Sequence, residues 1–134
     1  MNIHLATNDD IDILCLYDRH ISREELKNSI NLDRIFIAEK DKKFIGWLRY
    51  NLFWDNIPFM NLLYILENYQ NKGYGKALTE YWEAKMKALG YDMVLTSSQQ
   101  NEFAQHFYVK LGYKAIGGFN LNDDPMEIIF AKNI

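Results

Sequence analysis

Apolar and polar positions alternate along the chain in short blocks, and the period of each block predicts its secondary structure. Blocks with apolar residues at every second position, or in short continuous runs, predict strands. Blocks with apolar residues every three or four positions predict helices. The predicted strands lie at 3–5, 34–39, 44–51, 60–66, 93–96, 113–117 and 127–132, and the predicted helices at 11–20, 22–30, 77–89 and 101–111. The order β-α-α-β-β-β-α-β-α-β-β predicts an α/β fold of the layered α+β kind, with a mixed sheet and helices on both faces.

Several residues mark where these elements begin, end or bend. Ser22 and Glu25 have the spacing of a capping box, in which each side chain accepts the other residue's backbone N–H. Asn101 is predicted to cap the last helix, and Gly112 to end it in a left-handed conformation. Gly46 lies inside a predicted strand, which suggests a bulge or a close approach of another backbone.

Composition narrows the class of protein. A chain of 134 residues predicts a single domain over residues 1–134. The net charge of −3 argues against a surface built for nucleic acid. Cys15 is the only cysteine, which excludes an internal disulfide, and no histidine spacing suggests a metal site, so we expect none. Without a signal peptide or a long apolar run, a cytoplasmic protein without membrane association is expected.

The stretch after the predicted strand 60–66 carries the candidate chemistry. It reads Gln70-Asn71-Lys72-Gly73-Tyr74-Gly75-Lys76-Ala77-Leu78 and leads into a helical pattern. A strand, a glycine-rich turn and a helix N-terminus together direct backbone N–H groups at an anion such as phosphate. A dinucleotide fingerprint would need a small residue at Leu78, and a P-loop would need a hydroxyl at Ala77, so neither motif fits.

Two motifs resemble the GNAT superfamily of acyl-CoA-dependent N-acyltransferases. The first is Gln70-x-x-Gly73-x-Gly75-x-Ala77-Leu78 after an apolar strand. The second is Asn101-x-x-Ala104-x-x-Phe107-Tyr108-x-x-Leu111-Gly112-Tyr113. The two motifs occur along the chain in the same order as in the family, and each lies on the secondary-structure element expected for it. The resemblance implies a GNAT fold with a mostly antiparallel sheet split into a V, acetyl-CoA as the acyl donor, and no metal.

The resemblance also assigns a coenzyme site. Backbone groups of Ile65, Leu66 and Glu67 would pair with the pantetheine arm, and Asn101 would bond its amides. A backbone N–H near Leu66 is a candidate donor to the oxyanion of the tetrahedral intermediate. The pyrophosphate would be held around Gln70, Asn71, Lys72, Gly73, Tyr74, Gly75 and Lys76.

Tyr108 stands where the family has the residue that protonates the departing CoA thiolate. A thiol with a pKa near ~8.5 and a tyrosine near ~10 make that transfer feasible. Family members often have a carboxylate on the central strand as general base, but this chain has Phe59, Met60 and Asn61 there. Glu67 is the nearest substitute, Asp55 and Glu24 are further candidates, and a water relay is the alternative. Without the motif, Tyr108 would be read as a core aromatic.

Aromatic residues around the strand pair 44–51 and 60–66 suggest an acceptor pocket. Trp54 is the main candidate, together with the acids Asp18, Glu24 and Asp55. They favour an acceptor that carries an amine and an apolar or aromatic part. This hypothesis rests on composition alone.

The sequence therefore predicts an N-acetyltransferase that uses acetyl-CoA and acts by direct transfer in a ternary complex. The acceptor is a small-molecule or peptide amine, and the protein is a monomer or a homodimer. A CoA-binding sensor without turnover is a second interpretation, supported by the missing strand carboxylate. A third is an NAD(P)-binding half-domain, which NADH rather than CoA would stabilise.

Overall fold

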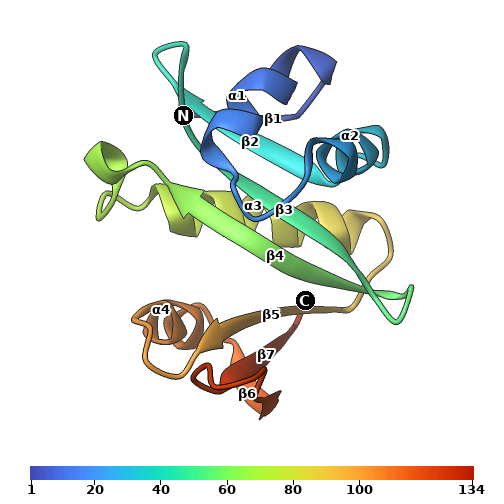
Figure 1. The fold of residues 1–134 in the computed structure, drawn as a ribbon, viewed down its shortest axis with the longest axis vertical. Helices are drawn as coiled ribbons and strands as arrows, with labels where there is room; N and C mark the ends of the chain where they lie inside the picture. Colours follow the sequence, from blue (N-terminus) through green and yellow to red (C-terminus); the bar gives the residue numbers. More distant parts are fainter. The chain divides into compact units, whose positions relative to one another are not determined.

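The computed structural model describes residues 1–134 and contains seven strands and four α-helices. The strands are β1 (Asn2–Leu5), β2 (Ile35–Lys40), β3 (Lys43–Phe53), β4 (Ile57–Ile65), β5 (Met93–Gln99), β6 (Lys114–Phe119) and β7 (Glu127–Asn133). The helices are α1 (Ile11–Tyr17), α2 (Arg23–Asn31), α3 (Tyr74–Ala88) and α4 (Ala104–Lys110), with short 3-10 helices η1 (Asn8–Asp10) and η2 (Glu67–Tyr69). The predicted order of strands and helices is confirmed (Figure 1).

The strands hydrogen-bond in the order β1-β2-β3-β4-β5-β7-β6. Neighbours β1/β2, β2/β3, β5/β7 and β6/β7 are antiparallel, whereas β4 and β5 are parallel. A parallel pair needs a crossover connection, and α3 supplies it between β4 and β5. The predicted mixed, mostly antiparallel sheet is confirmed. The V-shaped split of that sheet stays a prediction.

The chain forms two compact units, and each contains two segments. Unit 1 comprises Met1–Asn51 and Leu62–Thr79, and unit 2 comprises Leu52–Asn61 and Glu80–Ile134. The glycine-rich turn belongs to unit 1 and Tyr108 to unit 2.

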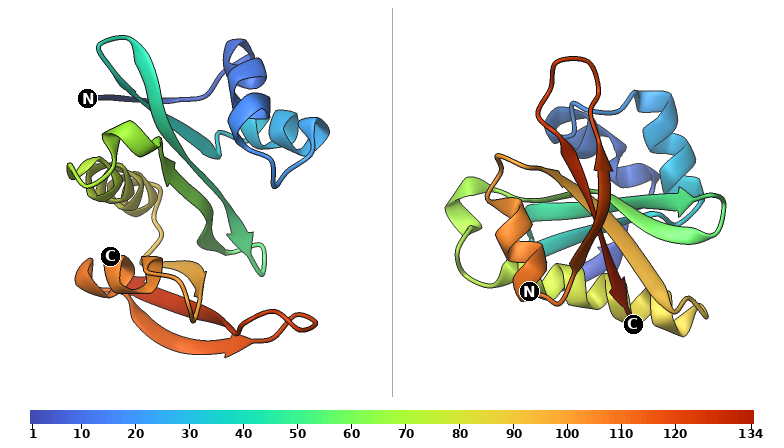
Figure 2. Two further views of the ribbon diagram at one scale, coloured as in Figure 1. Left: turned by 60° about the vertical axis from the view of Figure 1, so that its left-hand side comes forward. Right: turned by 90° about the horizontal axis from the view of Figure 1, so that it is seen from below.

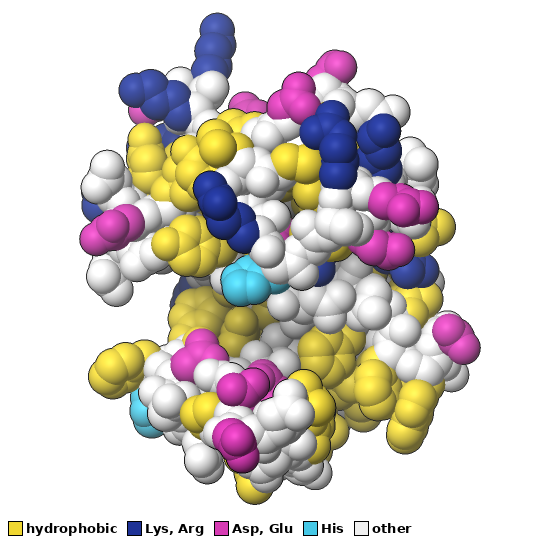
Figure 3. Space-filling model, in the orientation of Figure 1, with side chains coloured by type: hydrophobic (Ala, Val, Ile, Leu, Met, Phe, Trp, Pro, Cys, Tyr) yellow, Lys and Arg dark blue, Asp and Glu magenta, His cyan; other side chains and the backbone are white.

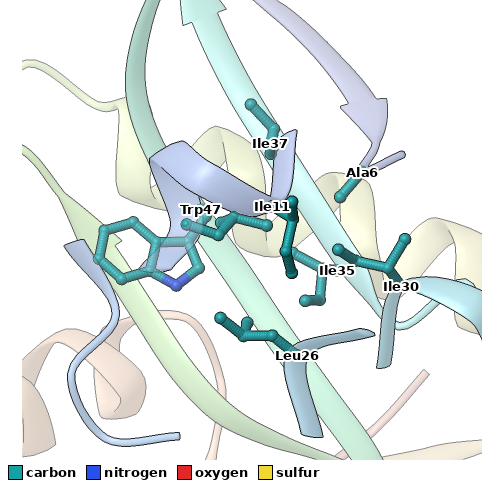
Figure 4. Close-up of a cluster of buried hydrophobic side chains, with 8 residues drawn as sticks. Ala6, Ile11, Leu26, Ile30, Ile35, Ile37 and Trp47 are labelled. Atoms are coloured by element: carbon teal, nitrogen blue, oxygen red, sulfur yellow. The ribbon is translucent and has the colours of Figure 1, made fainter. Parts of the chain in front are cut away.

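The core of unit 1 forms where α1 and α2 pack on β2 and β3. Ile35 and Ile37 alternate along β2 and face the same side, as the period of a strand requires. They meet side chains of both helices and the Trp47 ring of β3 (Figure 4). The buried members of this cluster are Ala6, Ile11, Leu14, Leu26, Ile30, Ile35, Ile37 and Trp47. Burial of this apolar surface holds the two helices on the sheet.

The start of each N-terminal helix is fixed by a side-chain cap. Thr7 and Asp10 form a reciprocal capping box at η1, which continues into α1. At α2 the Ser22 hydroxyl accepts the Glu25 N–H at 3.2 Å, which confirms the serine half of the predicted capping box. These bonds satisfy N–H groups that a helix leaves without partners in its first turn.

One face of the sheet of unit 2 surrounds Tyr108. Side chains of Thr96 and Phe130, which pair across β5 and β7, face the same side as Tyr108 of α4. On that side Glu83 of α3 accepts a hydrogen bond from the Tyr113 hydroxyl and pairs with Lys132 of β7, both at 2.8 Å. The β6–β7 hairpin closes the unit (Figure 2).

Charges of both signs are interspersed on the molecular face drawn in Figure 3. That face has no continuous positive patch of the kind that nucleic-acid-binding proteins present. No helix combines the length and the apolar character that crossing a bilayer requires. No group of three or more His, Cys, Asp or Glu side chains is placed to hold a metal ion.

Candidate active site

A bulge in β3 shapes the end of β4. Ala38 pairs with Gly46 and Glu39 with Phe44, so Ile45 is an extra residue in β3. A Cβ on Gly46 would lie 2.5 Å from the Tyr64 carbonyl oxygen, which is far inside the contact distance. The glycine therefore lets the backbones of β3 and β4 approach closely, and both predicted features, bulge and close approach, are present.

The same bulge uses the backbone amide of Leu66. The Leu66 N–H donates to the Ile45 carbonyl at 2.8 Å, and the Leu66 carbonyl accepts the Tyr69 N–H at 2.8 Å. An amide already engaged by β3 is not available to an oxyanion. The N–H of Leu66 itself is therefore engaged by the carbonyl that the extra residue in β3 presents, and a neighbouring backbone N–H as donor to the oxyanion stays a prediction.

The segment after β4 folds back onto the strand end. Its side-chain link is Gln70, whose amide donates to the Ile65 carbonyl at 2.7 Å. Between them η2 places Glu67 in its first turn, where the carboxylate is exposed and complements the positive end of the helix. Gln70 thus fixes the turn that follows. Direct contacts of Gln70 and Glu67 with a coenzyme stay predictions.

The glycine-rich turn has the backbone geometry of an anion site. Asn71 and Gly73 both have positive φ angles, 61° and 87°, and α3 begins at Tyr74. The Ala77 N–H donates to the Gly73 carbonyl at 3.1 Å, so the amides from 73 to 76 precede the helical hydrogen-bond ladder. No atom lies within 4 Å of the Cβ position of Gly73, and the Lys72 and Lys76 side chains are exposed. The turn therefore has the exposed backbone amides that anion sites at helix N-termini use.

A third lysine of unit 1 lies near this turn. Lys40, at the end of β2, places its ammonium 5.4 Å from the centroid of the Tyr74 ring. A hydrogen bond with Tyr74, aided by the charges around it, raises the pKa of Lys40. No sequence pattern indicates this neighbour, because only the folding of β2 brings Lys40 to the first residue of α3.

Tyr108 is buried on the inner side of α4. It is 6% exposed and contacts the rings of Phe107, Tyr113 and Phe130 at centroid distances of 5.4, 5.6 and 6.2 Å. Burial raises the pKa of its phenol to about 12, and a hydrogen bond with Thr96 acts in the opposite direction. The phenol is therefore protonated at neutral pH, as a proton donor must be. The Thr96 hydroxyl also donates to the Met60 carbonyl at 3.0 Å.

The predicted cap of α4 is wrong. The helix begins at Ala104, and its N-cap residue is Phe103, which makes no side-chain capping bond. Asn101 lies exposed in the preceding turn, where Glu102 bonds back to Gln99 through both its N–H and its carboxylate. This turn delays the start of the helix beyond the reach of Asn101. A contact of Asn101 with a coenzyme stays a prediction.

The predicted acceptor residues lie in different settings. The Asp18 carboxylate is buried and accepts hydrogen bonds from the Trp47 indole at 3.1 Å, the Arg49 guanidinium at 2.9 Å and the His20 amide at 3.3 Å. These bonds join the end of α1 to β3, so its first role is to stabilise unit 1. Glu24 is exposed in the first turn of α2.

Trp54 and Asp55 form the turn between β3 and β4. Both have positive φ, 53° and 61°, and the Asn56 N–H donates to the Phe53 carbonyl at 3.1 Å. This is the pattern of a type I′ hairpin turn. Trp54 is 78% exposed. Trp54 and Asp55 are therefore accessible to a ligand, unlike Asp18.

The sequence model described as "Acetyltransferase (GNAT) family" matches residues 6–113. The chain belongs to this family. Among curated proteins no sequence match was found. The resemblance to the GNAT superfamily is thus confirmed, and the family match spans the glycine-rich turn and Tyr108.

Solved GNAT structures share the fold over nearly the whole chain. A GNAT acetyltransferase from Bacillus cereus is 26% identical, with a TM-score of 0.79 over 98% of this chain and 96% of that one. An aminoglycoside 6'-N-acetyltransferase complexed with coenzyme A is 18% identical, with a TM-score of 0.81 over 99% and 97%. The ribosomal-protein-S18-alanine N-acetyltransferase from Escherichia coli is 16% identical, with a TM-score of 0.82 over 99% and 93%. The named acceptors differ, so the GNAT fold alone does not specify one.

Proposed function

We propose that this GNAT protein transfers the acetyl group of acetyl-CoA to a primary amine of an acceptor, by direct attack in a ternary complex. The observation that carries the proposal is the turn at Gly73, which presents consecutive backbone amides at the start of α3 in a member of an acetyltransferase family. Acetyl-CoA supplies an acyl group activated as a thioester and a pyrophosphate that such a turn can bind.

Each part of the coenzyme has a proposed partner. The amides of residues 73–76 hold the pyrophosphate, and the exposed charges of Lys72 and Lys76 add attraction. Backbone groups from Ile65 to Glu67 hold the pantetheine arm as an added strand would be held. Because the Leu66 N–H already donates to the Ile45 carbonyl, the other backbone groups of this segment hold the pantetheine arm.

Tyr108 is the proposed general acid. The amine nitrogen attacks the thioester carbonyl carbon, the C–N bond forms, and the C–S bond breaks with its electron pair on sulfur. Tyr108 then donates its phenolic proton to that sulfur. With a phenol pKa of about 12 and a thiol pKa near ~8.5, the transfer is uphill by about 5 kcal/mol in isolation. Thr96 reduces this cost when its hydroxyl turns from the Met60 carbonyl, to which it donates, toward the forming phenolate.

The incoming amine must lose a proton before it attacks. Its free pKa near ~10 leaves it mostly protonated at neutral pH. Glu67 is the proposed acceptor of that proton, directly or through a water, because its carboxylate is exposed beside the end of β4.

An acetyl-CoA turnover screen over an amine library tests the proposal. An acetyltransferase releases one CoA thiol for each N-acetylated amine, detected by a thiol reagent and by mass spectrometry. A CoA-binding sensor would bind acetyl-CoA in calorimetry but release no thiol with any amine. A dinucleotide-binding protein would be stabilised thermally by NADH and not by CoA.

A further inference from the structure

An apolar pocket of about 400 Å³ lies wholly within unit 2. No charged side chain lines it. Its lining residues are Phe53, Trp54, Ile57, Phe59, Met93, Leu95, Ile116, Gly117, Phe119 and Ile129. The volume lies in the range of pockets that bind small molecules, and the lining suits an uncharged apolar or aromatic group.

The pocket lies on the face of the sheet opposite Tyr108. Leu95 and Thr96 are adjacent in β5, so their side chains point to opposite faces. Thr96 faces Tyr108, whereas Leu95 lines the pocket with Phe59, its partner in β4. The pocket is therefore separated from the surroundings of the proposed acid by the thickness of one strand pair.

Trp54 at the rim is hard to explain by folding alone. Type I′ turns favour Asn-Gly or Asp-Gly, because both central residues need positive φ. A bulky residue such as tryptophan in this conformation is a true outlier. Its ring packs on Phe53 at a centroid distance of 4.8 Å, yet the residue is 78% exposed. Such a placement costs stability and gains little burial, which is characteristic of a residue kept for binding.

We propose that this pocket binds the apolar or aromatic part of the amine acceptor, an inference that rests on the proposed acetyl transfer. The lining offers no partner for the phosphates or amides of CoA, so the coenzyme is not its ligand. It equally disfavours an acceptor that is polar throughout. The exposed Asp55 carboxylate next to Trp54 gives the rim of the pocket a negative charge that attracts an approaching cationic amine, but it lies at the other end of β4 from Glu67 and does not hold the reacting nitrogen. The acceptor class is therefore an amphipathic primary amine.

Tryptophan fluorescence reports occupancy without any turnover. Trp47 and Trp82 are 3% and 0% exposed, so acrylamide quenches Trp54 selectively. The probes are 2-phenylethylamine and ethanolamine, which share an ethylamine skeleton and differ in the apolar ring. We expect 2-phenylethylamine to protect Trp54 from acrylamide and ethanolamine to leave quenching unchanged. Equal quenching with both amines would overturn the proposal.

Paired variants test the pocket in the acetyl-transfer assay. Ile116 lines the pocket and Leu121 does not, yet they are 61% and 60% exposed. Ile116→Ser should lower kcat/KM for 2-phenylethylamine about tenfold and leave ethanolamine unchanged. Leu121→Ser should change neither. Trp54→Asn should lower kcat/KM for 2-phenylethylamine without lowering Tm, because asparagine tolerates positive φ.

The outcomes separate this inference from the proposed function. Protection of Trp54 without acetylation of any amine would support the pocket and contradict acetyl transfer. Acetylation with equal kcat/KM for both amines would support acetyl transfer and overturn the pocket. Sedimentation that shows a dimer, with Trp54 already protected in the absence of amine, would identify a second copy as the occupant and overturn the proposal.

Discussion

Tyr108 combines a packing role with a chemical one. Its ring is held by three other aromatic rings, and its hydroxyl hydrogen-bonds with Thr96. Burial keeps the phenol protonated over the physiological pH range, but the same burial makes it a weaker acid. The hydroxyl of Thr96 therefore decides how much proton-donating power Tyr108 retains.

Replacing Thr96 by valine should slow acetyl transfer about tenfold, because loss of the hydroxyl raises the pKa of Tyr108 further. The Kd for acetyl-CoA should not change, and the solvent isotope effect on kcat should increase as proton transfer becomes limiting. Thr96→Ser, which keeps the hydroxyl, is the matched control and should retain most of kcat. A Thr96→Val enzyme with normal kcat and isotope effect would refute the positioning role.

Individual site residues can be predicted from the sequence where they belong to a motif with a defined spacing. Tyr108 and the glycine-rich turn come from motif spacing, and the positive φ of Gly73 agrees with the turn. Thr96 and Lys40 carry no such signal, since their neighbours are set by strand pairing. The partner of the Leu66 N–H also carries no such signal, because it depends on the extra residue in β3.

At the scale of elements, the β3 bulge gives the sharpest stability prediction. Gly46→Ala should destabilise the protein by about 1–3 kcal/mol, since the new methyl group would lie 2.5 Å from a backbone oxygen that cannot rotate away. Urea unfolding measures the change. Gly117→Ala is the control, because nothing lies within 4 Å of its Cβ position, and it should stay within about 0.5 kcal/mol of the parent. Equal effects of the two variants would contradict the close approach.

A second element prediction concerns the pairing of β1 with β2. Burial acts to lower the pKa of His4, but hydrogen bonds to the Leu5 carbonyl and the Glu39 carboxylate raise it above 6.5 overall. Both ring nitrogens face acceptors, at 2.9 and 2.8 Å, so the charged imidazolium is favoured.

Because the folded pKa is raised, this stabilisation is fully present below pH 6.5 and is lost as pH rises through the folded value. The parent should exceed His4→Gln in stability at pH 5.5, by less than about 1 kcal/mol, and the difference should shrink at pH 8.5. Urea unfolding at both pH values checks this. A difference that grows with pH would contradict the assigned charge.

Element boundaries show where periodicity stops being informative. The apolar period identified every strand and helix, yet α4 begins at Ala104 rather than near Asn101. Side-chain bonds of Glu102 in the preceding turn set that boundary, and no periodic pattern reports them.

For the whole molecule, the order of elements was predictable because each block of the sequence has one clear period. The residues of the proposed acceptor pocket were less predictable than the order of elements. Trp54 was proposed for it from composition, but its positive φ and the surrounding pocket appear only when β3, β4, β5 and β6 are folded.

At this scale the family motifs predict a response to the coenzyme in each unit. Acetyl-CoA should slow amide hydrogen exchange in residues 70–77 of unit 1 and in residues 101–111 of unit 2 at the same ligand concentration. Residues 20–30, which lie in neither motif, provide the internal reference. Unchanged exchange in either motif segment would contradict the coenzyme role proposed for that segment.

The most direct test of the central claim, that Tyr108 is the general acid of acetyl transfer, is the turnover of Tyr108→Phe at neutral pH. The variant keeps the ring and removes only the proton donor. Binding of acetyl-CoA should stay within about twofold of the parent, and kcat should fall by about 10²-fold or more. Normal acetyl-CoA binding with kcat close to that of the parent would contradict the claim.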